Sequence, residues 1–231
     1  MSLVLLAHGS VNPAGPRMVE LLAARVRLRL PGVPVRPAYV EHVRPSLADV
    51  LVEAGRDAVV VPLLCAPGLD SPDPRRPSVL VADPLGPDRL LAGVQVTRLR
   101  AAGARPGQPV VMVGPGTDLL GSQRDSVRAA QLLQELWGGP VRAAHLTGHG
   151  ERMSQVVAEF RARDLALPAV SPYLVAPGHL LSKARQDARN LGIDLVADVL
   201  GDHPHVAEAV ARRYRATTAR QFALTLREAL L

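Results

Sequence analysis

Cysteine, lysine, aromatic residues and long apolar runs are all scarce in this sequence of 231 residues. The one cysteine, Cys65, cannot close an internal disulfide or form a thiolate metal cluster, which leaves imidazole and carboxylate groups as the available metal ligands. The apolar runs are far shorter than the roughly 20 residues that a membrane span requires, and no basic leader precedes an apolar stretch. We therefore expect a soluble protein of the cytoplasm with no membrane partner.

Arginine supplies nearly all of the positive charge. Lys183 is the one lysine among 27 basic residues, and the formal net charge is +6. This charge favours an anionic ligand such as a polycarboxylate or a phosphate. Aromatic residues make up only 3% of the chain and no basic stripe is interleaved with them, so we expect no nucleic-acid partner. The content of 48% hydrophobic and 21% charged residues is typical of a globular protein.

The chain contains two copies of one unit, because short phrases recur roughly 110 residues apart. The clearest pairs are residues 4–10 with 111–117, and residues 62–68 with 172–178. The join lies in the turn-rich stretch 104–107. The repeat therefore predicts an N-terminal lobe over residues 1–105 and a C-terminal lobe over residues 106–231.

Each copy alternates short runs rich in Val and Leu with longer segments of helical period. Such runs are typical of parallel strands covered by helices on both faces. In the first helical segment, Met18, Leu22 and Val26 recur every four residues and define an apolar face. We expect an α/β protein made of two flavodoxin-like, doubly wound lobes, each with a four-stranded parallel sheet.

The ends of the expected strands carry the candidate functional residues, because ligands of open parallel sheets bind beyond the carboxyl ends of the strands. These positions are His8, Glu41 and Leu69 in the first copy, and Pro115, Thr147 and His179 in the second. Two lobes that face each other would line a cleft with all six positions.

Four of the seven histidines, His8, His145, His149 and His179, lie at or near these strand ends. A functional role is favoured for His8 and His179, because strand-end loops are where sites concentrate. For His145 and His149, a solvated polar strand end is an equally good explanation. The remaining histidines are expected on the surface; they are His42, His203 and His205.

Other catalytic motifs are missing. The glycine-containing stretch 114–122 lacks the lysine of a phosphate-binding loop, and no dinucleotide fingerprint follows either opening strand. A nucleophile elbow of the G-x-S-x-G form is also missing. These observations argue against nucleotide hydrolysis, dinucleotide-dependent redox chemistry and serine hydrolysis.

An ordered set of phrases resembles the CbiX type of sirohydrochlorin chelatase over nearly the whole chain. The phrases are HGS at 8–10, YVE at 39–41 followed by PSL at 45–47, VPL at 61–63 before APG at 66–68, and APGH at 176–179. The resemblance implies two flavodoxin-like lobes around a tetrapyrrole cleft. It also implies insertion of cobalt or ferrous iron into sirohydrochlorin, for cobalamin or sirohaem synthesis, with no organic cofactor.

The resemblance implies that imidazoles and a carboxylate receive the metal ion. We predict His8, Glu41 and His179 as catalytic and metal-binding residues, with His145 as a further metal ligand. Neutral imidazole suits this chemistry, since it binds borderline divalent ions and accepts protons near neutral pH.

Three further residues are predicted to bind the tetrapyrrole. Ser10 lies at a strand-to-helix junction, where an anion can bind at the start of the helix. Arg44 and Lys183 are candidates to pair with the peripheral carboxylates of the substrate.

Neither copy has the complete ligand set that the resemblance implies, because Leu69 replaces a histidine in the first, and Pro115 and Thr147 occupy two positions in the second. Three arrangements follow: a site shared by His8, Glu41 and His179 across the cleft, a site rebuilt from His145, His149 and His179, or loss of activity. We favour the first.

The alternative function is a catalytically degenerate relative that holds tetrapyrrole or metal without turnover; a scaffold that binds neither is a third possibility. Because both lobes belong to one chain, we expect a monomer or weak oligomer.

Overall fold

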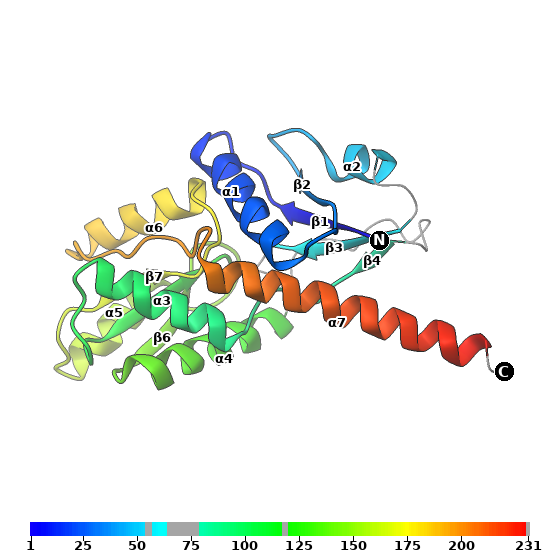
Figure 1. Ribbon diagram of the computed structural model, residues 1–231. Helices are drawn as coiled ribbons and strands as arrows, with labels where there is room; N and C mark the ends of the chain where they lie inside the picture. The colour runs from blue at the N-terminus through cyan, green and yellow to red at the C-terminus, as the bar shows by residue number, and fades with distance from the viewer. Residues whose placement is uncertain (54–56, 64–78, 117–119, 230–231) are drawn as a thin grey trace.

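A computed structural model describes residues 1–53, 57–63, 79–116 and 120–229 of the chain, and Figure 1 shows two α/β lobes joined along two helices. The first half contains β1 (Ser2–Ala7), α1 (Ala14–Arg29), β2 (Val35–Tyr39), α2 (Leu47–Glu53), β3 (Ala58–Pro62), β4 (Val79–Val81) and α3 (Arg89–Ala101). The second contains β5 (Val110–Gly114), α4 (Leu120–Trp137), β6 (Val141–His145), α5 (Met153–Ala162), β7 (Ala169–Pro172), α6 (His179–Asn190) and α7 (Pro204–Ala229).

Both sheets are parallel, and in each of them the first strand of that half lies between the second and the third. The order is β2-β1-β3-β4 in the first lobe and β6-β5-β7 in the second. In the ladders, Leu6 lies opposite Ala38 and Pro62, while Val113 lies opposite Ala144 and Pro172. The two lobes therefore have matching registers, as the sequence repeat predicts.

The expectation of a full fourth strand is wrong for the second lobe. In the described residues, that position holds a single bridge between Val196 and Val170. The chain then runs beside the segment that follows β7, where the amides of Leu200 and Gly201 donate to the carbonyls of Leu174 and Val175. The second sheet therefore has three strands and one bridging residue.

Alternate residues of the central strands pack against different helices, as expected for doubly wound lobes. Leu3 and Leu5 of β1 belong to the large core cluster that includes α1 residues. Val4 and Leu6 face the other side and pack with the buried residues of α2. In the second lobe, Val111 and Val113 likewise pack with buried residues of α5 and α6, while Met112 faces the large cluster.

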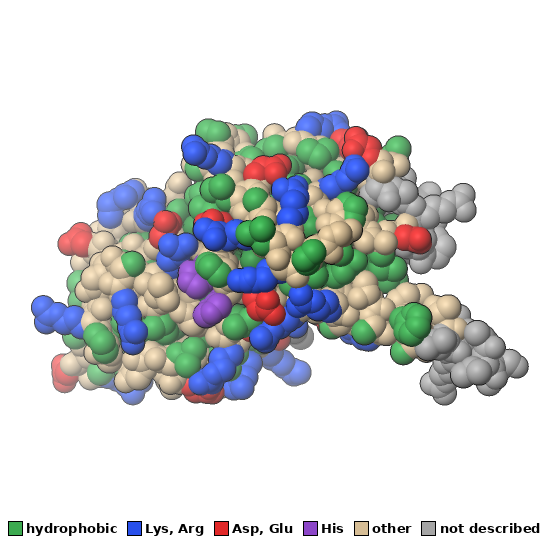
Figure 2. All heavy atoms as spheres, viewed as in Figure 1, with side chains coloured by type: hydrophobic (Ala, Val, Ile, Leu, Met, Phe, Trp, Pro, Cys, Tyr) green, Lys and Arg blue, Asp and Glu red, His purple; other side chains and the backbone are tan. Residues whose placement is uncertain are grey.

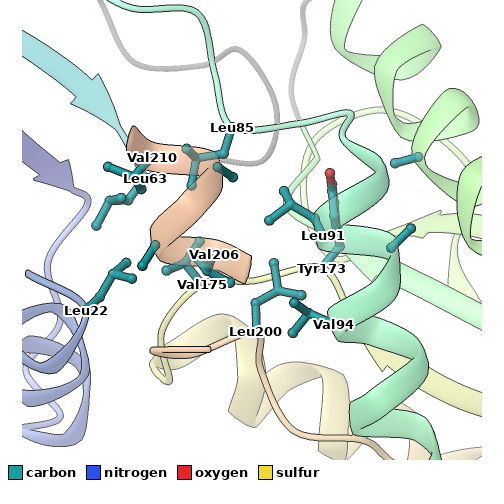
Figure 3. Close-up of a cluster of buried hydrophobic side chains, with 14 of the residues drawn as sticks. Leu22, Leu63, Leu85, Leu91, Val94, Tyr173, Val175, Leu200, Val206 and Val210 are labelled. Atoms are coloured by element: carbon teal, nitrogen blue, oxygen red, sulfur yellow. The ribbon is translucent and has the colours of Figure 1, made fainter. Parts of the chain in front are cut away.

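The large cluster runs without interruption from one lobe to the other, and Figure 3 shows its central part. Leu22 comes from α1, Leu91 and Val94 from α3, and Val206 and Val210 from α7. All five side chains have 0% exposure. Complete burial of a Val or Leu side chain contributes roughly 1.5–3 kcal/mol, so this shared core holds the lobes together.

The last helix of each half packs against the lobe of the other half. Helix α3 packs against α4 and β7, and Gln95 of α3 donates a 3.0 Å hydrogen bond to Ser171 of β7. Helix α7 packs against α1 and β3, and also against α3. Tyr214 of α7 donates to the carbonyl of Met1, at 3.0 Å. The predicted division at residue 105 therefore describes the repeat, whereas in space the two halves exchange helices.

The surface carries both signs of charge. On the face shown in Figure 2, Lys and Arg side chains are scattered over both lobes, with Asp and Glu between them. Several are paired, including Arg25 with Asp202 at 2.7 Å and Arg220 with Asp83 at 3.0 Å. None of the helices in the described part of the chain combines the length and the apolar character that crossing a bilayer requires.

Candidate functional site

The carboxyl edge of the first sheet brings His8 and Glu41 together. His8 directly follows β1, and Glu41 follows the neighbouring β2. The ladder continues past both strands, because Val40 donates to the carbonyl of Ala7 and Glu41 donates to the carbonyl of His8, each at 3.0 Å. The Nε2 atom of His8 lies 2.7 Å from Oε1 of Glu41, and the side chains are 61% and 46% exposed. Solvent and a small ion can therefore reach both groups.

Gly9 permits this close approach of the two strand ends. Its φ of +101° lies where L side chains are disfavoured, and an added Cβ would overlap the carbonyl oxygen of Glu41. The second lobe repeats the device, since a Cβ on Gly116 would overlap the carbonyl oxygen of Thr147. The predicted equivalence of Glu41 and Thr147 therefore holds in the backbone, although Thr147 supplies no carboxylate.

His42 is a further member of the site that the sequence did not reveal. Its Nε2 atom lies 3.2 Å from the same Oε1 atom of Glu41 that His8 contacts. The side chain is 47% exposed, so His42 lies on the surface as expected, but in contact with the candidate carboxylate Glu41. Two signals in the sequence could have found it, namely its position next to Glu41 and its alignment with a glycine, Gly148, in the second copy.

Arg44, predicted to bind substrate carboxylates, is already paired. Its Nη1 atom lies 2.7 Å from Oδ2 of Asp49, and the Arg44 side chain is 79% exposed. Hydrogen bonds from the backbone and side chain of Ser46, followed by that from Arg44, lower the pKa of Asp49 to about 2. The Ser46 hydroxyl in turn accepts from the Asp49 amide at 3.2 Å. Arg44 thus takes part in the hydrogen-bonded turn that opens α2. A guanidinium has five N–H donors, and the contact with Asp49 uses only part of them.

Lys183 is paired in a similar way, within α6. Its Nζ atom lies 3.0 and 3.1 Å from the two carboxylate oxygens of Asp187, one helical turn away. Both predicted substrate-binding cations therefore have a carboxylate partner, and a substrate carboxylate would have to share or replace it.

Ser10 lies where the two lobes meet beside the strand ends. Its hydroxyl accepts from the amide of Asn12 at 3.1 Å, in the turn that leads into α1. A Cβ added to Gly178 would stand 3.2 Å from the Ser10 hydroxyl oxygen, and one added to Gly15 would stand 2.8 Å from the carbonyl oxygen of Pro177. The turn that begins α1 therefore packs against the turn that precedes α6. Along the chain, His8 precedes Ser10 by two residues, and His179 directly follows Gly178.

The structure joins two of the four predicted metal ligands. His8 and Glu41 are in contact, but in the described ranges no three His, Cys, Asp or Glu side chains are grouped so that they could hold a metal ion. Ligation shared with His179 stays a prediction. Leu69, the position at which the first copy departs from the family pattern, lies outside the described residues, as does Cys65.

His145 is buried rather than solvated. It ends β6 with 8% exposure, and its ring packs against Gly150, where an added Cβ would overlap the ring. Its amide donates to the carbonyl of Glu151 at 2.8 Å, and Nδ1 is buried without a hydrogen-bond partner. Burial, followed by the charge of Arg152, lowers the pKa of His145, which favours the neutral imidazole. The side chain serves the packing of this loop, while the neighbouring His149 is exposed.

Comparison with known proteins gives a consistent result. SirB from Bacillus subtilis with Fe3+ superposes with a TM-score of 0.77 at 25% identity, over 96% of this chain and 98% of that one. The same fold occurs in the sirohydrochlorin chelatase SirB from subspecies spizizenii in complex with cobalt, with a TM-score of 0.73 at 21% identity and coverage of 94% and 95%. It also occurs in CbiX, the terminal enzyme of sirohaem biosynthesis in denitrifying bacteria, with a TM-score of 0.70 at 22% identity and coverage of 94% and 99%.

No sequence among the curated proteins is similar enough to match. The family model CbiX, however, matches the chain twice, over residues 2–102 and 109–217. These two segments correspond to the two copies of the internal repeat and together cover most of the sequence. The chain therefore belongs to the CbiX family.

Proposed function

We propose that this protein is a metal chelatase that inserts divalent cobalt or ferrous iron into sirohydrochlorin or a closely related tetrapyrrole. The observation that carries the proposal is the exposed contact between His8 and Glu41 at the carboxyl edge of the first sheet, 2.7 Å between Nε2 and Oε1. The relatives support the substrates, since one SirB structure holds Fe3+ and another, a sirohydrochlorin chelatase, holds cobalt.

The residue types suit the reaction. A divalent ion that enters the macrocycle displaces two pyrrole protons, so the site must release a metal ion and accept protons. Imidazole nitrogen and carboxylate oxygen together bind borderline divalent ions. Once the ion has moved to the macrocycle, the freed Nε2 of His8 can accept one of the two protons, with Glu41 stabilising the resulting imidazolium, and the other proton passes to solvent water. The insertion involves no electron transfer, so the proposal requires no organic cofactor.

The proposed site extends across the contact between the lobes. Because the turn at Ser10 packs against Gly178, the start of α6 with His179 lies on the second-lobe side of the same contact. We retain His179 as the catalytic group from that side, and Ser10, Arg44 and Lys183 as substrate-binding groups. His145 stays a further candidate ligand, and it is the least accessible of them because its ring is buried against Gly150. A monomer or weak oligomer in the cytoplasm remains part of the proposal.

The test is a spectrophotometric assay of cobalt(II) or iron(II) insertion into sirohydrochlorin. We expect insertion by the wild type and a large loss of rate in His8→Ala and Glu41→Gln. Glu53→Gln is a matched control, because Glu53 is an exposed carboxylate paired with Arg36 at 2.7 Å on the first lobe.

The outcomes separate the candidate functions. Equal rates for wild type and His8→Ala would remove His8 from the site. Tight binding of the tetrapyrrole without any metal insertion would instead select the degenerate binding protein. Absence of both metal and tetrapyrrole binding in calorimetry would select the scaffold.

A further inference from the structure

His42 occupies a backbone conformation that a residue with a side chain seldom adopts. Its φ is 64°, and in the described residues it shares a positive φ with only one other non-glycine residue, Asp164 at 52°. In this region Cβ crowds the following carbonyl oxygen, so L residues are disfavoured. The same position of the second copy is Gly148, with φ 57°, which adopts the conformation without that crowding.

The repeat thus offers an internal comparison of one loop position with and without a side chain. The loops are equivalent in their backbone, because the amide of Tyr39 donates to the carbonyl of Pro45 as the amide of His145 donates to the carbonyl of Glu151. Only the first copy has a carboxylate next to this position, at Glu41. The strained histidine and the candidate carboxylate therefore occur in the same lobe.

The His42 side chain makes a specific contact from this position. Nε2 lies 3.2 Å from Oε1 of Glu41, and His8 Nε2 lies 2.7 Å from that oxygen. The Glu41 carboxylate thus lies against one imidazole from its own loop and another from the neighbouring strand end. The Val43 amide donates to the Glu41 carbonyl at 2.8 Å, which fixes the backbone between them. An exposed carboxylate would otherwise sample several rotamers.

We propose that His42 is a positioning residue, which from its left-handed loop position holds the Glu41 carboxylate beside His8 for the entering metal ion. This inference rests on the proposed function, because it assigns the ion to His8 and Glu41. It adds a residue that acts through Glu41. Groups that orient metal ligands from outside typically change metal affinity or activity by about 10–100-fold when they are removed.

The experiment compares His42→Gly, His42→Gln and Asp164→Gly with the wild type. Three quantities are measured: affinity for cobalt(II) alone by calorimetry, the rate of cobalt insertion into sirohydrochlorin, and the melting temperature. Glycine removes both the side chain and the backbone crowding, whereas glutamine keeps an N–H group at a comparable distance from the backbone. Asp164→Gly is the matched control, because Asp164 is exposed, has positive φ and lies at the end of α5, outside the site.

For His42→Gly we expect cobalt affinity and insertion rate to fall about 10–100-fold, while the melting temperature stays the same or rises. His42→Gln should regain most of the loss. Asp164→Gly should keep wild-type affinity and rate. This combination separates a positioning role from a structural one. If His42 were merely structural, a substitution that preserves stability would leave the activity unchanged.

The opposite outcomes overturn the inference. Wild-type affinity and rate in His42→Gly would mean that the side chain does nothing for the site. A His42→Gln variant as impaired as His42→Gly would mean that the imidazole itself binds the ion or takes a proton, which contradicts a role through Glu41. A wild type whose cobalt affinity falls in His42→Gly as expected, but which inserts no cobalt, would refute the proposed function alone. Active insertion that is unaffected in His42→Gly would refute the inference alone. A wild type that neither binds nor inserts cobalt would refute both.

Discussion

The substitution Gly9→Ala tests the close approach of the two strand ends that carry His8 and Glu41. Two effects add at this position. The positive φ of Gly9 disfavours a Cβ by about 1–2 kcal/mol. The overlap with the Glu41 carbonyl oxygen forces a backbone shift, for which overpacking typically costs another 1–3 kcal/mol or so. We expect a total loss of roughly 3 kcal/mol in the free energy of unfolding, a large part of the 5–15 kcal/mol typical of a folded protein.

Gly32→Ala is the matched control, because Gly32 has a φ of +80° but no atom within 4 Å of an added Cβ. It should lose only the conformational part, about 1–2 kcal/mol. Urea unfolding followed by circular dichroism gives both values, and the cobalt-insertion assay adds a second readout. Gly9→Ala should also slow insertion, since the shift moves Glu41 away from His8, whereas Gly32→Ala should not. Equal destabilisation in the two variants would refute the argument that backbone contact requires glycine at position 9.

Two further predictions concern the turn before α2 and the core between the lobes. Asp49→Asn should reduce the free energy of unfolding at neutral pH, because the pKa of Asp49 in the folded protein is lowered from 3.8 to about 2. The difference in stability from wild type should be present above pH 4 and disappear as the pH falls to about 2. Urea unfolding at a series of pH values measures it. Stability differences that do not depend on pH would contradict this. Leu91→Ala, with Leu91 fully buried between the lobes, should cost about 2–5 kcal/mol, against less than about 0.5 kcal/mol for the exposed Leu167→Ala. Fluorescence of Trp137 in the second lobe and circular dichroism of both lobes should report one shared transition, and two separate transitions would show that the lobes unfold independently.

The repeat and the strand ends could be predicted because both depend on short local sequence motifs. The aligned phrases place Leu63 and Tyr173 at equivalent positions, and the structure gives them equivalent hydrogen bonds, from the Leu63 amide to the Leu6 carbonyl and from the Tyr173 amide to the Val113 carbonyl. Short runs rich in Val and Leu identified the strands, and adjacency of parallel strand ends placed His8 near Glu41. The features that depend on the local sequence could thus be predicted.

Other features depend on choices that periodicity leaves open. An apolar helix face shows that α3 and α7 must be buried, but does not say against which lobe. His145 could be predicted to end a strand, yet its burial depends on the loop that places Gly150 against its ring. The contact of His42 with Glu41 depends on a left-handed backbone, for which the alignment with Gly148 was the one sequence signal.

The crossing of α3 and α7 also limits how the gene for this protein can be divided. A fragment ending near residue 105 would present the apolar side of α3 to water, since its partners α4 and β7 lie in the remaining fragment. The complementary fragment would expose α7 in the same way, because that helix covers α1 and β3. Either piece produced alone would be prone to aggregate, whereas co-expressed pieces could reassemble by trading these helices. Covalent linkage of the two copies keeps each helix at high effective concentration near its acceptor surface.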